Sequence, residues 1–330
     1  MCDKLINLDL FYIRAVQIAS TQIGKARVPT LNILMCTYNG GAYLEPQLQS
    51  LLAQDHADWR LWSSDDGSED DTVSQLTGFA AAHPDRVMPP LTGPGRGAAA
   101  HFLSLLARPE MAGQWVAFAD QDDVWLPHKL ARAVDQLGQE GAIGPAVYAS
   151  RSLHTDAQGA VLGPSPRHAR ALGFGNALVQ NVLAGNTLVL TPGATDLLRA
   201  TLDAAQDVPF HDWWVYLVAT GAGIPVINDA EPGVLYRQHR GNLLGAGGRQ
   251  RMGRAALLWN GTYARWIDAN IAALSGIAGH LTPEAAALTE TVRGWRTQSG
   301  RRVSPQALGL YRQSANGDRI LRTLARLRRL

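Results

Sequence analysis

The sequence predicts an α/β fold, in which a mainly parallel sheet is flanked by helices and followed by a helical C-terminal region. Two observations favour this fold class. Apolar runs typical of buried strands alternate with helical stretches between Leu31 and about residue 125. Polar residues also cluster directly after each expected strand. Such alternation is typical of parallel sheets with helices on both faces.

Strands and helices are expected to alternate regularly in the first part of the chain. The strands are expected at LNILMCTY (31–38), WRLWSS (59–64), RVMPPL (86–91) and WVAFA (115–119). The helices between them are expected at 42–54, 70–83 and 98–107. The first of these helices carries its leucines on one side, which is the face that a helix buries against a sheet.

The pattern is less regular beyond residue 140. Apolar runs occur at AVYAS (146–150) and NTLVL (186–190), a helix is expected to include HDWWVYLVA (211–219), and VLYRQH (234–239) follows. From about residue 250 the chain is expected to be helical, and it ends in an amphipathic segment. The apolar face of that segment holds Ile320, Leu321, Leu324, Leu327 and Leu330.

Length and composition are those of an ordinary globular protein. The 330 residues are 46% hydrophobic, and no apolar run approaches the roughly 18 residues that span a bilayer. The first thirty residues lack the ordered parts of a secretory signal, so a cytoplasmic location is expected. The only cysteines are Cys2 and Cys36, which argues against a disulfide framework or a thiolate metal site.

The net charge of +2 is unevenly distributed. Residues 301–330 hold eight arginines and a single acid, Asp318, so this tail has a net charge of +7 and the rest of the chain −5. Nucleic-acid-binding proteins more often spread basic residues over a folded face, so no nucleic-acid partner is expected. Two interpretations of the tail remain open. It lies on an anionic membrane surface with its arginines toward the headgroups, or it packs its leucines on the rest of the protein.

Four polar clusters follow the first four expected strands. They are TYNGG (37–41), DDGS (65–68), GPGRG (93–97) and DQDD (120–123). In parallel sheets, ligands bind outside the carboxyl ends of the strands, where such loops converge. The sequence therefore predicts one site built from four loops at one edge of the sheet.

The cluster DQDD is the densest group of acids in that site. Two carboxylates spaced as Asp120 and Asp122 can bind one divalent cation, and oxygen ligands suit Mg²⁺ or Mn²⁺. A cation would also explain why like charges are crowded there. The alternative is that Asp122 and Asp123 only cap a helix beginning near Pro127.

The other loops allow two interpretations each. DDGS is an ordinary turn, or it presents a carboxylate to the N–H edge of a pyrimidine. TYNGG is a glycine turn, or a cradle for a nucleotide with Tyr38 near the base. GPGRG fits a dinucleotide-binding loop poorly because it follows the third strand and not the first. Arg96 either faces a diphosphate or is a solvated loop residue.

Two residues farther along the chain complete the candidate site. Asp212 precedes an aromatic helix, where apolar neighbours would raise its pKa and suit it to act as a general base. Alternatively, it is a carboxylate favoured by the helix dipole. His239 in YRQH is either a metal or diphosphate ligand, or an ordinary surface or core histidine.

Six segments in order carry a resemblance to a known family. They are TYNGGAYLEPQLQSLLAQ, SDDGSEDDT, FADQDDVWLPHKL, GNTLVL, HDWWVYLVATGAG and VLYRQHRGN. Together they resemble the family 2 glycosyltransferases, which have the Rossmann-like GT-A fold, and in particular their rhamnosyltransferase-like branch in bacterial polysaccharide synthesis. The resemblance spans about residues 31–245.

The resemblance implies a nucleoside diphosphate sugar donor, Mn²⁺ or Mg²⁺, and inversion at the anomeric carbon. Matched to the motifs of the family, Asp212 stands at the catalytic base and Asp122 and His239 at metal ligands. The implied nucleotide-sugar contacts are Thr37, Tyr38, Asn39, Asp65, Asp66, Arg96, Asp120 and Gln121. Of these, Asp66, with Asp65, would contact the pyrimidine, and Asp120 the ribose or the metal shell. His101 departs from the family pattern, in which Asn is usual.

These expectations define a function and its alternatives. The resemblance implies transfer of a sugar, with rhamnose one candidate, to a hydroxyl of a saccharide or lipid-linked acceptor. A non-catalytic sugar-nucleotide-binding or scaffold protein docked on a membrane is the alternative from another class. A nucleotidyltransferase would be expected to carry a basic Gly-rich loop after its first strand, and TYNGG has no cation.

Three regions are expected along the chain. Residues 1–29 form an extension to which we assign no role, and residues 30–245 form the GT-A domain. Within that domain, the nucleotide-binding half is expected at 30–125 and the acceptor half at 126–245. Residues 246–330 form a helical, basic C-terminal region.

Overall fold

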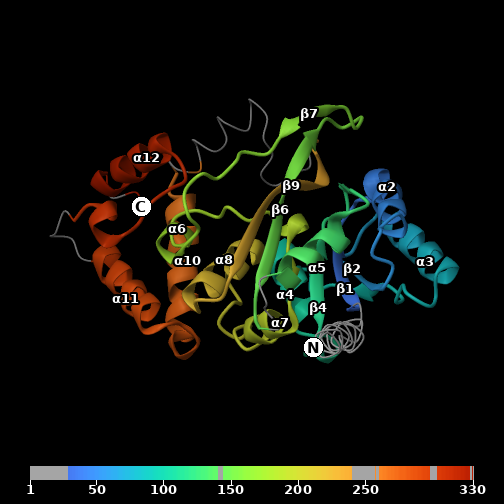
Figure 1. The fold of residues 1–330 in the computed structure, drawn as a ribbon, viewed down its shortest axis with the longest axis horizontal. Coiled ribbons are helices and arrows are strands. Elements are labelled where there is room, and N and C mark those ends of the chain that lie inside the picture. Colours follow the sequence, from blue (N-terminus) through green and yellow to red (C-terminus); the bar gives the residue numbers. More distant parts are fainter. Residues whose placement is uncertain are drawn as a thin grey trace, which may run out of the picture.

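A computed structural model describes residues 29–139, 144–239, 257, 260–297, 303–327 and 329. Almost all of the expected extension at 1–29 lies outside these residues. The described chain forms one sheet with helices against both of its faces and a group of C-terminal helices at one end (Figure 1). The predicted α/β class, with flanking helices and a helical C-terminal region, is confirmed.

The first half of the sheet is parallel. Its strands are β1 (Leu31–Thr37), β2 (Trp59–Asp65), β3 (Leu91–Thr92) and β4 (Trp115–Ala119), which lie in the order β3-β2-β1-β4. All three pairings among them are parallel. The carboxyl ends of these strands therefore lie at one edge, as the sequence predicted.

The second half of the sheet is mixed. It contains β5 (Val124–Trp125), β6 (Val147–Thr155), β7 (Val161–Pro164), β8 (Val189–Leu190) and β9 (Val226–Arg237). Strand β8 runs antiparallel between β4 and β6, whereas β9 runs parallel to β6. Strand β7 forms an antiparallel hairpin with β6.

One expected strand and one apolar run form shorter strands than their sequence patterns suggest. In RVMPPL, only Val87 makes an isolated bridge to Leu61, and β3 begins at Leu91. Pro89 and Pro90 lie between them and have no N–H to donate to a ladder. NTLVL begins in a 3₁₀ turn, η2 (Gly185–Thr187), and only its last two residues form a strand.

The helices expected beside the parallel strands are confirmed within one to two residues at most ends. They are α2 (Gly41–Leu52), α3 (Thr72–Ala82) and α4 (Ala98–Leu106). The other helices are α5 (Lys129–Gln139), α6 (Phe174–Ala177), α7 (Pro192–Arg199), α8 (His211–Gly221), α10 (Thr262–Gly276), α11 (Pro283–Thr297) and α12 (Ala315–Arg326). Further 3₁₀ turns are η1 (Pro109–Met111), η3 (Ala278–His280) and η4 (Pro305–Leu308).

Each central strand buries both of its faces. In β1, Leu34 and Cys36 pack into one core with helices α4 and α8, while Ile33 and Met35 pack into a second core with α2 and α3. Alternate residues of a strand point to opposite faces of the sheet. A strand covered on both sides is therefore continuously apolar, which is why these runs were recognisable in the sequence.

Helix α12 divides its apolar row between the interior and the solvent. Leu321 and Leu324 are buried in the same core as α8, whereas Ile320 and Leu327 are 43% and 50% exposed. Leu330 lies outside the described residues. An ion pair from Arg170 to Asp318 at 2.8 Å also holds the start of the helix. Of the five residues on the expected apolar face, two therefore pack on the rest of the protein.

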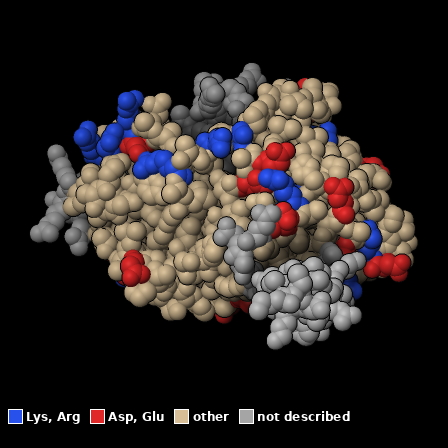
Figure 2. Space-filling view, in the orientation of Figure 1, with Lys and Arg blue, Asp and Glu red and all other residues tan. Residues whose placement is uncertain are grey.

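The exposed side of this end of the molecule is basic. Figure 2 shows Lys and Arg side chains gathered at the upper left, where α12 lies in Figure 1. Among the described residues, no helix has both the length and the apolar character needed to cross a bilayer.

We expect Leu321→Ala to destabilise the protein by about 2–5 kcal/mol, because it leaves a cavity in a packed core. Leu327→Ala, directly after the same helix, should change the free energy of unfolding by less than about 0.5 kcal/mol, because Leu327 is half exposed. Denaturant unfolding of the two variants measures the difference. Equal effects would show that α12 is not docked as described.

Candidate active site

Hydrogen bonds link all four predicted loops at the carboxyl edge of the parallel strands. The loops after β1 and β2 are joined by a bond from the Asp66 N–H to the Thr37 carbonyl oxygen at 2.9 Å. The loops after β1 and β4 are joined by Gln121. Its Oε1 accepts from the Tyr38 N–H at 2.9 Å, and its Nε2 donates to the Tyr38 carbonyl at 3.0 Å. Gln121 thus pairs with this backbone as a neighbouring strand would.

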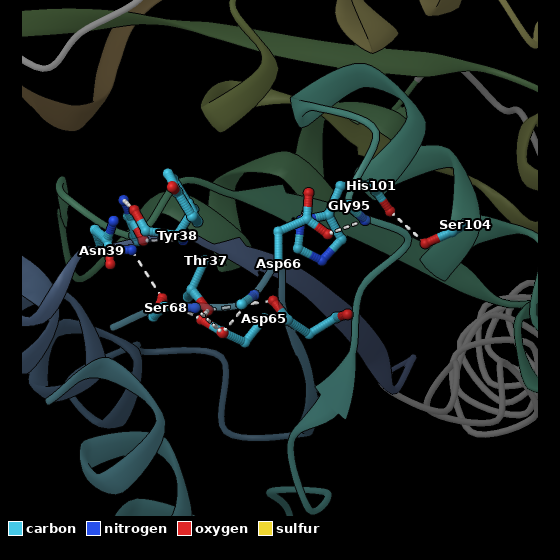
Figure 3. A network of polar contacts seen from close by, with 12 residues as sticks. Thr37, Tyr38, Asn39, Asp65, Asp66, Ser68, Gly95, His101 and Ser104 are labelled. Carbon is cyan, nitrogen blue, oxygen red and sulfur yellow. Dashed lines mark hydrogen bonds and ion pairs between the residues drawn. The ribbon is translucent and has the colours of Figure 1, made fainter. Parts of the chain in front are cut away.

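Asp65 and Thr37 form the buried base of the loop after β2 (Figure 3). Asp65 accepts hydrogen bonds from the Thr37 hydroxyl at 2.7 Å, from the Ser68 hydroxyl at 2.6 Å and from the Ser68 and Gly67 N–H groups at 2.7 and 3.0 Å. Burial raises the pKa of Asp65, but the bonds from Ser68, Thr37 and Gly67 together hold it below its usual value. Both side chains are directed into the protein, so their expected contact with a nucleotide stays a prediction.

Asp66 faces the loop after β3 and the buried His101. It accepts from the Gly95 N–H at 2.9 Å and lies 3.4 Å from His101 Nδ1 (Figure 3). Burial lowers the pKa of His101, although the charges of Asp66 and Asp65 oppose this effect. A neutral imidazole can then donate from Nδ1 to Asp66. His101, which departs from the family pattern, therefore helps to position Asp66, the expected pyrimidine ligand.

The loop after β1 has a tight conformation. Asn39 has a positive φ of 47°, which Asn tolerates better than most residues, and its Oδ1 accepts from the Glu69 N–H at 2.9 Å. A Cβ on Gly40 would collide with the Gln121 amide and displace it from its hydrogen bonds to Tyr38. Tyr38 remains 58% exposed beside this turn. Its ring is therefore accessible to a ligand at the sheet edge.

Arg96 does not point toward the acids of the site. Its guanidinium donates to Gln206, to Oε1 at 3.3 Å and to the carbonyl oxygen at 3.4 Å. Both residues are exposed. The structure thus joins the loop after β3 to the chain before α8, and the contact of Arg96 with a diphosphate stays a prediction.

The acids of DQDD have different environments. Asp123 is fully buried, accepts from the Asn186 side-chain amide and accepts from the Arg237 N–H at 3.2 Å. Burial and the charges of Asp122 and Asp120 raise its pKa well above the usual value. Asp122 instead bonds to His239, with Oδ2 and Nε2 2.7 Å apart. The alternative in which Asp122 and Asp123 cap the next helix is therefore not supported, because both side chains are engaged elsewhere.

Asp122 and His239 are brought together although they are 117 residues apart. The His239 ring stacks on Tyr43, with 4.5 Å between the ring centroids. The Arg237 side chain donates from Nε to the Asp122 carbonyl at 3.0 Å. The two expected metal ligands thus lie on adjacent segments that β9 and helix α2 hold in place.

Asp120 and Asp212 line one cavity of about 480 Å³. Asp212 begins α8 and accepts from the Trp213 N–H at 2.7 Å, from the Gly185 N–H at 3.2 Å and from the Asn181 side chain. Burial raises its pKa to about 6. Burial, followed by the charges of Asp122 and Asp212, raises the pKa of Asp120 to about 8. Asp212 is therefore both a helix-start carboxylate and a group that faces a cavity.

The carboxylates fit a divalent cation by their chemistry. Burial, together with the charges of Asp122 and Asp212, raises the proton affinity of Asp120, and a bound cation would oppose this effect. Asp122 and His239 lie side by side and would supply an oxygen and a nitrogen ligand. In the part of the chain that the structure describes, no three His, Cys, Asp or Glu side chains are already arranged around one point as metal ligands. The donor set fits Mn²⁺ or Mg²⁺.

Sequence reasoning missed two asparagines of this site. Asn181 bonds to Asp212, and Asn186 bonds to Asp123. Asn186 was part of the recognised segment GNTLVL, but that segment was interpreted as an apolar run. Asn181 belongs to no recognised pattern, so only its position in the fold reveals its role.

We expect Asp65→Asn to lower the free energy of unfolding at pH 7 by about 1–3 kcal/mol, because several donors lose a charged acceptor. The folded-state pKa of Asp65 is depressed, so its contribution is present above about pH 4 and is lost as the pH falls through the folded-state pKa. Denaturant unfolding should show the gap between variant and wild type closing below pH 4. A constant gap would contradict the role of the ionised carboxylate.

Comparison with known proteins connects this geometry to a family. The model of the family described as Glycosyl transferase family 2 matches residues 32–186. The dTDP-rhamnosyl transferase RfbG of Shigella flexneri is 29% identical over 227 residues, which are 64% of this chain and 74% of RfbG. An uncharacterized glycosyltransferase of Nostoc sp., alr2836, is 34% identical over 115 residues, or 34% of each chain.

Solved structures show more distant likenesses. Residues 1–349 of S. aureus TarS align with a TM-score of 0.49 and 15% identity, over 91% of this chain and 88% of that one. The mannosyltransferase PcManGT from Pyrobaculum calidifontis, solved with GDP-Man and Mn²⁺, aligns with a TM-score of 0.46 and 17% identity, over 96% and 93%. On the sequence matches, which include all four of the loops described above, residues 32–186 of this chain belong to glycosyl transferase family 2, and the chain is a glycosyltransferase.

Proposed function

We propose that this glycosyltransferase moves a sugar, with inversion, from a nucleoside diphosphate sugar to a hydroxyl of a saccharide or lipid-linked acceptor in cell-surface polysaccharide synthesis. The similarity to RfbG makes dTDP-rhamnose the first donor to test. The observation that carries the proposal is that Asp212, from the motif expected to supply the base, and Asp120, from the motif expected to bind the donor, line the same cavity. The nucleotide would lie against the loops after β1 and β2.

Asp212 is the proposed general base. With a pKa of about 6 it is largely ionised at pH 7, yet basic enough to accept a proton from an attacking hydroxyl. The N–H groups of Trp213 and Gly185 and the Asn181 amide fix the orientation of its carboxylate. One base on the acceptor side is sufficient for inversion, unlike the carboxylate pairs of hydrolases.

The donor would be held by residues at the sheet edge. Tyr38 is exposed next to the glycine turn, and Asp66 is fixed by His101 and the Gly95 N–H near the expected base position. Asp122, His239 and Asp120 would hold Mn²⁺ or Mg²⁺. When bound, the cation neutralises the charge that develops on the departing diphosphate.

A membrane contact is a further part of this proposal. Ile320 and Leu327 are exposed on α12, on a basic end of the molecule. Arginines beside exposed apolar side chains suit an anionic interface. Such a contact would present a lipid-linked acceptor to an enzyme at the cytoplasmic face.

We expect Asp212→Asn to retain donor-dependent thermal stabilisation and to lose about 10²–10⁴ in transfer rate, because it removes the base and keeps the shape. In the wild type, the rate should fall as the pH drops below about 6, where Asp212 becomes protonated. Transfer measured by nucleoside diphosphate release, with dTDP-rhamnose and an acceptor panel, checks both results.

Asn181→Ala is the matched control for this experiment. It keeps the base but removes a hydrogen bond that lowers the pKa of Asp212, so the acidic limb should move to higher pH. Unchanged turnover of Asp212→Asn would exclude Asp212 as the base. If the wild type binds a donor but transfers no sugar with any donor and acceptor tested, the result would instead favour the non-catalytic alternative.

A further inference from the structure

The wall of the cavity beyond Asp120 and Asp212 is basic. It includes Arg151, Arg167, His154 and His168, none of which belongs to the motifs that indicate donor binding. Arg151 and His154 come from strand β6, and Arg167 and His168 come from the segment that follows β7. The lining of the cavity therefore combines carboxylates with cationic or protonatable groups.

The two arginines have no acidic partner in the part of the chain that the structure describes. Arg151 donates from Nε and Nη2 to the Ser165 carbonyl oxygen, a neutral acceptor that fixes the guanidinium without cancelling its charge. Arg167 is exposed and forms no ion pair. The remaining acid of the cavity wall, Asp229, is already paired with Arg132 and accepts from the Tyr148 hydroxyl.

The backbone places these groups on one wall. The pairing of β6 with β9 shifts register on both sides of Arg151. Such irregularities redirect side chains, which explains how the consecutive residues Ser150, Arg151 and Ser152 can all line the cavity. The charge of Arg151 also contributes to lowering the pKa of His168, after burial, so the two side chains are close in space.

The hairpin beside this wall is apolar at its outer end. Val161 and Leu162 in β7 are 61% and 63% exposed, the highest values among the large hydrophobic side chains of the described residues. Figure 1 shows the β6–β7 hairpin projecting at the top of the sheet. Residues 165–168, which contribute to the basic wall, follow β7 directly.

The geometry points to a phosphate subsite for the acceptor. Arg151 and Arg167 bind a phosphate or diphosphate group of the acceptor molecule, and the outer end of the β6–β7 hairpin contacts the lipid chain attached to that group. The fork of an arginine matches phosphate oxygens, and two unpaired arginines suit a doubly charged group better than a single carboxylate. This inference rests on the proposed transfer reaction and specifies its acceptor as a lipid-linked phosphate.

The subsite can be tested without donor or metal. We expect the full chain to bind inorganic diphosphate in a calorimetric titration in the presence of a chelator. The chelator removes any cation that could otherwise hold the anion at the carboxylates. Arg167→Gln and Arg151→Gln should each weaken binding about tenfold. Arg60→Gln, an exposed arginine on β2 outside the cavity wall, should not change it.

The Arg167→Gln variant is expected to fold, because the Arg167 side chain is exposed. It therefore tests the subsite even if Arg151→Gln does not fold. The absence of diphosphate binding by the wild type, or unchanged affinity in Arg167→Gln and in a folded Arg151→Gln, would overturn the subsite. Binding of glucuronate in preference to diphosphate would overturn the assignment to phosphate. None of these results depends on Asp212, so they are separate from failure of the proposed transfer.

A second titration tests the lipid source. Geranyl diphosphate should bind more tightly than inorganic diphosphate, and the double variant Val161→Ser, Leu162→Ser should remove the difference while inorganic diphosphate binds as before. Equal affinities of the wild type for the two probes would overturn the lipid contact. A gain in affinity that survives in the double variant would overturn the role of the hairpin.

Discussion

The burial of Asp120 beside the charges of Asp122 and Asp212 is the constraint around which this site is built. Burial and the two neighbouring charges raise the pKa of Asp120 to about 8, so the three groups do not all ionise readily in the protein alone. The sequence nevertheless places two of them two residues apart at a strand end, and the fold adds the third across the cavity. A divalent cation is the component that would let all three carry charge together.

Hydrogen bonds from the surrounding structure hold the loop that carries Asp120 and Asp122 in place. Asp123 connects the loop after β4 to Asn186 and to β9, and Arg237 of β9 also holds the Asp122 carbonyl. Gln121 connects the same loop to the turn at Tyr38, and Asp65 fixes the neighbouring loop. Groups held by such bonds are oriented before any ligand arrives, which lowers the entropy lost on binding. The side chains facing the cavity thus depend on others that a ligand would not touch.

Much of the fold could be predicted from the sequence because the central strands are buried on both faces. Strands β1 and β4 are almost continuous apolar runs, and polar residues begin where each strand reaches the sheet edge. The prediction of a strand at RVMPPL was wrong for most of its length, because adjacent prolines lack the N–H groups that a strand ladder needs.

In the site, the proximity of Asp122 and His239 was implied only by family resemblance. The roles of Asn181 and His101 were not predictable, because they arise from segments that are joined only in three dimensions. The domain limits and the roles of the site residues stay predictions.

The most direct test of the account is the number of protons released when Mn²⁺ binds in the presence of dTDP. Because the pKa of Asp120 is about 8, this carboxyl is largely protonated at pH 7, and a cation should displace about one proton from it. Calorimetric titrations in buffers of different ionisation enthalpy measure this release. The account predicts about one proton per ion for the wild type, none for Asp120→Asn, and greatly weakened binding for Asp122→Ala. Tight Mn²⁺ binding that releases no proton and survives Asp122→Ala would contradict it.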